Sequence, residues 1–162
     1  MRLLVVVIRF VTLVLLAVVT AGLLPRLAFP APDLLLLVVL GVALLRGARS
    51  GLVWGLVAGW LVDLVPPGAG VLGSTALTYG AVGWLAGGVA ATVRRSWILT
   101  SLTVAVSALL VQGVRWVMAL ALGHQTGDTV DPWAWLLTTL LGCVVVPVLM
   151  HLENAALTRN AT

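Results

Sequence analysis

Two ionisable side chains, Asp63 and Arg115, lie inside long apolar segments of the sequence. Charges are costly within a membrane, so an ionisable residue in a membrane span is a candidate for function. Asp63 is in the last turn of the segment 51–65, and Arg115 lies about 27 Å along a helix that begins at Trp97. Both are therefore expected near the outer leaflet. There they could form a structural ion pair, contact a partner protein, or take part in proton or ion transport.

The other residue types that could do chemistry lack partners at a usable spacing. His124 is expected in an external loop and His151 on the opposite, cytoplasmic side, so the two cannot share a metal ion. Cys143 is the single cysteine and lies in an apolar run, where it is expected to pack as a small hydrophobic residue. The glycines follow helix-packing periods and not the pattern of a phosphate-binding loop. We therefore expect no catalytic residues, no cofactor, no metal and no enzyme activity.

The composition is that of an integral membrane protein. Of the 162 residues, 62% are hydrophobic and 9% are charged, whereas soluble proteins average roughly 45–50% apolar and 25% charged. All nine basic residues are arginines, and the net charge of +4 is spread along the chain. This distribution gives no basic patch for nucleic acid, so the arginines are interpreted as signals of membrane orientation.

The apolar segments predict one all-α transmembrane domain with six helices over residues 1–162. The predicted spans are 3–24, 33–45, 51–65, 71–93, 97–122 and 133–152. Arginines mark the turns after the second and fourth spans, at Arg46, Arg49, Arg94 and Arg95. Because cytoplasmic segments are rich in arginine, both termini are predicted to be cytoplasmic. The short second and third spans could instead form a re-entrant hairpin, but this would place the first two of these arginines inside the membrane.

Small residues at helical spacing predict how two of the helices pack. Gly51, Gly55, Gly59 and Asp63 are four residues apart, so they lie on one stripe of the third helix. The fourth span has a matching face of small residues, which includes Gly73, Gly80, Gly83 and Gly87. Small-xxx-small faces let membrane helices approach closely and gain dispersion contacts. We therefore expect the third and fourth helices to pack through these glycines.

The stretch 51–79 resembles the family of rod shape-determining proteins called MreD. It reads G-L-V-x-G-x-x-x-G-x-x-x-D-L-V-P-P-G-x-G-V-L-G-S-x-A-L-x-Y. The chain is also similar to that family in its length, its number of predicted spans and the arginine-bearing turn before the glycine stripe. The family's fold is similar to that of the S-components of energy-coupling-factor transporters, so the resemblance implies this fold.

The resemblance implies a non-enzymatic scaffold subunit of the bacterial cell-wall elongation complex, in the cytoplasmic (inner) membrane, needed for cell shape and peptidoglycan synthesis. It implies MreC as the direct partner, with MreB, RodA and a class B penicillin-binding transpeptidase in the same complex. The alternative is the substrate-binding S-component of an energy-coupling-factor vitamin transporter. In such proteins an A-x-x-x-A pair, here Ala17 and Ala21, contacts the coupling subunit. A solute pocket would need more converging polar groups than this sequence offers, which favours the scaffold.

Overall fold

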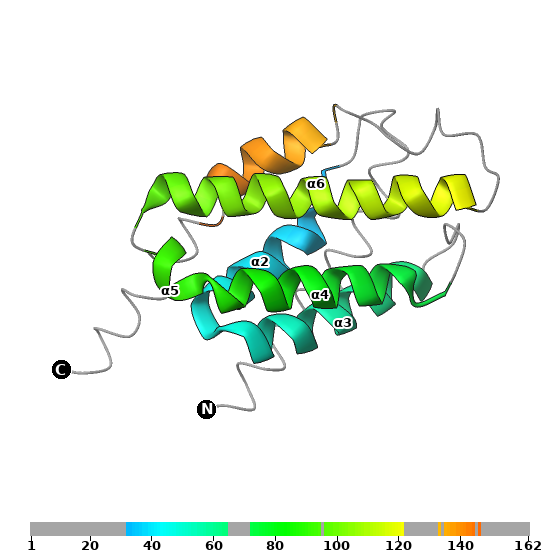
Figure 1. The fold of residues 1–162 in the computed structure, drawn as a ribbon, viewed down its shortest axis with the longest axis horizontal. Helices are drawn as coiled ribbons and strands as arrows, with labels where there is room; N and C mark the ends of the chain where they lie inside the picture. Colours follow the sequence, from blue (N-terminus) through cyan, green and yellow to red (C-terminus); the bar gives the residue numbers. More distant parts are fainter. Residues whose placement is uncertain are drawn as a thin grey trace.

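A computed structural model describes residues 32–64, 72–94, 96–121, 133, 135–144 and 146, and every regular element in these residues is an α-helix (Figure 1). The predicted first span 3–24, the loop 123–132 and Arg95 lie outside the described residues. The last predicted span, 133–152, is described only in its first part. The all-helical architecture of the described part agrees with the predicted fold class.

Helix α2 (Leu34–Arg46) lies at the centre of the described bundle. Asp33 caps its first turn, since the side-chain Oδ1 accepts a hydrogen bond from the backbone N–H of Leu36 at 3.1 Å. The helix ends at Gly47, whose φ of +88° is a conformation that favours glycine. Leucines and valines on all sides of α2 are buried, and α2 contacts α3, α4, α5 and α6. A helix that is apolar all round needs this cover on every side.

Helices α3 (Ala48–Leu64) and α4 (Ser74–Gly88) run side by side and form the most extensive helix pair among the described residues (Figure 1). A methyl group placed on Gly55 would lie 2.3 Å from the carbonyl oxygen of Tyr79. One placed on Gly51 would lie 2.2 Å from the carbonyl oxygen of Gly83. Real Cβ atoms do not approach other atoms this closely, so the two backbones are in direct contact and these positions require glycine.

The other glycines predicted to pack differ in their surroundings. Gly59, Gly83 and Gly87 also meet backbone atoms of the facing element, at 2.4 to 2.5 Å from an added methyl group, and Gly80 faces the side chain of Leu56 at 3.0 Å. The packing prediction is wrong for Gly73, which has open space around it. Its φ of +91° and its place just before Ser74 make it the N-cap of α4, so it serves the turn and not the interface.

The predicted fourth span, 71–93, is divided in the structure. Helix α4 ends at Gly88, and the short helix α5 (Ala90–Val93) follows after Val89. Consecutive glycines at 87 and 88 lower the helix propensity at this point, which accounts for the break. The Arg94 side chain then donates from Nη1 to the carbonyl oxygen of Leu45 at 3.5 Å, which links the end of α5 to the end of α2.

Helix α6 (Trp97–Ala121) extends along one long side of the bundle (Figure 1). Its 25 residues give a length of about 37 Å. In the described part of the chain it is the one helix that is both long and apolar enough by itself to cross a bilayer. The apolar helix Trp135–Val144 packs beside it, because Trp97 Nε1 donates to the carbonyl oxygen of Cys143 at 3.2 Å. Helix α2 is much shorter, at about 20 Å for its 13 residues.

Candidate functional site

The charged residues of the described bundle lie at its two ends. Arg46 and Arg49 lie at the α2–α3 turn, and the bond from Arg94 to Leu45 places Arg94 at this same end. Asp33 and Asp63 lie at the other end, because α2 begins there and α3 returns to it. We call these the arginine end and the aspartate end. Arg115 is near the C-terminal end of α6 and reaches the aspartate end.

Asp33, Tyr79 and Arg115 form a cluster that joins the first turn of α2 to α4 and α6. The Arg115 Nη2 atom lies 3.0 Å from Asp33 Oδ2 in an ion pair, and it donates a second hydrogen bond to the Tyr79 hydroxyl oxygen at 3.2 Å. The Tyr79 hydroxyl in turn donates to Asp33 Oδ2. Tyr79 is fully buried, whereas the Arg115 side chain is 42% exposed to its surroundings. The cluster therefore extends from the buried interior of the bundle, at Tyr79, to its surface, at Arg115.

The structure gives Asp63 and Arg115 different partners, so the ion pair that was one of the possibilities for these two residues is not formed. Asp63 Oδ2 accepts from the backbone N–H of Gly73 at 2.9 Å and more weakly from that of Ala76 at 3.4 Å. These N–H groups belong to the N-terminal turn of α4, where backbone donors lack partners within the helix. Asp63 thus caps α4 across the α3–α4 connection. Its bonds favour a structural role over contact with a partner protein.

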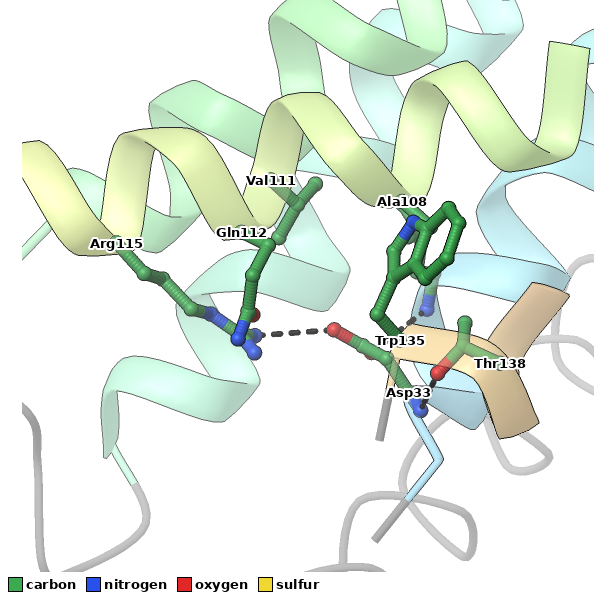
Figure 2. A pocket seen from close by; sticks show the side chains of 8 residues that line it. Asp33, Ala108, Val111, Gln112, Arg115, Trp135 and Thr138 are labelled. Carbon is green, nitrogen blue, oxygen red and sulfur yellow. Dashed lines mark hydrogen bonds and ion pairs between the residues drawn. The ribbon is translucent and has the colours of Figure 1, made fainter. Parts of the chain in front are cut away.

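A small cavity of about 30 Å³ lies beside the cluster, between the start of α2, α6 and the helix Trp135–Val144 (Figure 2). Its polar lining comes from Asp33, Gln112, Arg115, Trp135 and Thr138. Figure 2 shows the Arg115 and Gln112 side chains extending from α6 toward the side where Asp33 lies. The Thr138 hydroxyl oxygen accepts from the backbone N–H of Asp33 at 2.9 Å, which fixes the Trp135–Val144 helix against the start of α2.

The cluster is built to hold helices together and not to do covalent chemistry. Leu36 N–H, the Tyr79 hydroxyl and Arg115 all donate to the Asp33 carboxylate, so it is not poised to take a proton from a substrate. Within the described residues no three His, Cys, Asp or Glu side chains lie close enough to hold a metal ion. Hydrogen bonds to charged groups contribute about 1.5–3 kcal/mol each, and the exposure of Arg115 places its bonds toward the lower value.

The sequence carried one signal that identifies Asp33. An acidic residue directly before a run of leucines is typical of a helix N-cap, and Asp33 precedes four leucines. Its contact with residues 46 and 82 positions away leaves no local pattern. Tyr79 lies within the predicted fourth span, 71–93, and nothing in its spacing marks it as a partner of Asp33 or Arg115. Its place in the cluster depends on how α4 rotates against α3.

Comparison with known proteins identifies the family of this chain. The family model for the rod shape-determining protein MreD matches residues 1–155, which is nearly the whole chain of 162 residues. In the comparisons with curated proteins and with solved structures, nothing matched. The extent of the family match confirms the resemblance noted at residues 51–79. The chain therefore belongs to the rod shape-determining protein MreD family, whose members are non-enzymatic membrane proteins with a role in rod shape determination.

Proposed function

We propose that this protein is a scaffold subunit of the bacterial cell-wall elongation complex, needed for cell shape and for peptidoglycan synthesis. The observation that carries this proposal is the match of the MreD family model over residues 1–155. Membership in that family implies participation in the rod shape complex. The direct partner proposed is MreC, with MreB, RodA and a class B penicillin-binding transpeptidase in the same assembly.

The described packing suits a scaffold, which must present fixed surfaces to several partners. The α3–α4 pair is held by direct backbone contact at Gly51, Gly55 and Gly59. Such a contact leaves little freedom for one helix to slide on the other, because protein interiors are close-packed and resist small shifts. Helix α6, by contrast, exposes apolar side chains along much of its length, among them Ile98, Leu109 and Val117.

We place the protein in the cytoplasmic membrane of a bacterium, with six spans and both termini cytoplasmic. The exposed arginines Arg46, Arg49 and Arg94 share one end of the bundle, which supports a cytoplasmic arginine end. A single cysteine introduced at Ala48, with Cys143 replaced by alanine, tests this orientation. An impermeant thiol reagent added outside cells should leave residue 48 unlabelled, and labelling from outside would contradict the proposed topology.

The transporter alternative finds less support. Ligand pockets for small molecules usually enclose about 300–1,000 Å³, whereas the cavity at the aspartate end is about 30 Å³. The Ala17 and Ala21 pair lies outside the described residues. Family membership favours shape determination over vitamin uptake.

Co-purification and complementation together test the scaffold function. The tagged chain should restore rod shape to cells depleted of their own MreD protein and should co-purify with MreC. Gly55→Leu should fail in both assays, since it forces α3 and α4 apart, while Val53→Leu on the exposed face of α3 should pass both. Co-purification with an ATP-binding cassette pair and a bound vitamin, without MreC, would establish the transporter instead.

A further inference from the structure

The cavity at the aspartate end is lined by hydrogen-bond donors of Arg115 and Trp135. Arg115 donates from Nη2 to Asp33 and Tyr79, and its side chain is 42% exposed. A guanidinium carries five N–H donors, and these two bonds use only those of Nη2. The Trp135 Nε1 atom is buried and has no partner in the described structure. Trp135 and Arg115 both line the cavity.

Two acceptor groups of the cavity, the Asp33 carboxylate and the Thr138 hydroxyl, already receive hydrogen bonds. Asp33 accepts through Oδ1 from Leu36 and through Oδ2 from Tyr79 and Arg115. The Thr138 hydroxyl oxygen accepts from the backbone of Asp33. A buried donor without an acceptor is unfavourable, since it loses its bonds to water and gains none in return. A group that brings further acceptors into the cavity would satisfy the buried Trp135 donor.

The depth of the cavity indicates where such a group comes from. Arg115 lies about 27 Å from Trp97 along α6, close to the roughly 30 Å thickness of a bilayer core. With Trp97 at one boundary, the cavity lies near the other, at the level of the lipid phosphates. Met118, three residues after Arg115 and therefore on the same side of α6, is 40% exposed. This apolar side chain is suited to contact an acyl chain of a lipid whose phosphate reaches Arg115.

We propose that this cavity binds the phosphate group of a membrane lipid, with Trp135 Nε1 and the Arg115 guanidinium as its hydrogen-bond donors. The cavity volume of about 30 Å³ admits one or two phosphate oxygens, and the remainder of the headgroup lies at the mouth beside the 42% exposed Arg115 side chain. Asp33 keeps the guanidinium in position through Nη2. The same chemistry would also accept free phosphate, so the source is a matter for the experiment.

The test uses the full-length protein in phosphate-free dodecyl maltoside, with bound lipid measured by native mass spectrometry. The probes are dioleoyl phosphatidylglycerol, dioleoylglycerol, which has the same chains without phosphate, and inorganic phosphate. We expect the phospholipid to bind and dioleoylglycerol not to bind. If inorganic phosphate competes with the phospholipid, the phosphate site is supported, and free phosphate is a second ligand of the site. Equal binding of both lipids would overturn the proposal.

Two variants locate the site. Trp135→Phe keeps an aromatic ring and removes the unpartnered donor, so phospholipid affinity should fall by roughly 10- to 150-fold, the loss expected for one hydrogen bond to a charged group. Arg115→Lys keeps the charge opposite Asp33 but loses the fork of donors, and should weaken binding further. Trp84→Phe on the exposed face of α4 is the matched control and should bind as the wild type does. Wild-type affinity in Trp135→Phe would also overturn the proposal.

Discussion

The α3–α4 glycine interface and the Asp33–Tyr79–Arg115 cluster hold the same bundle by opposite means. The interface is stabilised by the absence of side chains, since Gly51, Gly55 and Gly59 let two backbones touch and gain dispersion contacts. The cluster is stabilised by three polar side chains from three helices. The first depends on shape and tolerates no added atom. The second depends on charge and hydrogen bonds, so it can be weakened in steps.

The largest expected effect is a break of the interface by a bulky residue. In Gly55→Leu the new Cβ would lie 2.3 Å from the backbone oxygen of Tyr79, and a backbone cannot move aside as a flexible side chain can. Overpacking commonly costs about 1–3 kcal/mol, and direct collision with backbone should exceed the upper value. The measurement is unfolding in detergent, followed by circular dichroism. Val53→Leu, on the exposed side of α3, should leave the midpoint unchanged.

The next effect is the coupling within the cluster, which a double-mutant cycle isolates. Asp33→Asn and Arg115→Gln each leave a partner without its charge, so the two losses should not add. We expect a coupling free energy of about 1–3 kcal/mol, since Arg115 is partly exposed. The same cycle on Asp63→Asn and Arg115→Gln serves as the control and should be additive. Coupling in the control cycle alone would show that Arg115 pairs with Asp63 after all.

The two regions also differ in how far the sequence predicts them. The glycine stripe repeats every four residues on one helix, so its period revealed both the helix and the face that packs. The partner of Arg115 could not be found this way, because Asp33 is 82 residues distant and both aspartates lie at the same end of the bundle. To predict which aspartate pairs with Arg115, one must know how α3 is rotated about its axis. In the structure this rotation directs Asp63 to the start of α4.

A smaller loss of stability is expected from replacing Asp63, because its carboxylate accepts hydrogen bonds from the first turn of a helix and forms no ion pair in the described residues. Asp63→Ala removes the acceptor for the N–H groups of Gly73 and Ala76, and should cost about 1 kcal/mol, the usual loss for a helix cap. Asp63→Asn keeps a side-chain oxygen and should retain most of the stability. The check is thermal unfolding of both variants in detergent. An equal loss in the two would mean that the charge of Asp63 matters and not its acceptor oxygen.

The smallest effect separates glycines that the interface needs from one that it does not. Gly113 lies within α6, is exposed, and a methyl group added to it would meet nothing within 4 Å. Because alanine is a better helix former than glycine, Gly113→Ala should leave stability unchanged or raise it by up to about 1 kcal/mol. Gly59→Ala adds the same methyl group 2.4 Å from the Cα atom of Ala76 and should destabilise the protein. Unfolding midpoints of the two variants measured side by side check this. Equal destabilisation would mean that α6 is covered at Gly113 by another helix or a partner, and the contrast between a packed α3 and an open α6 would fail.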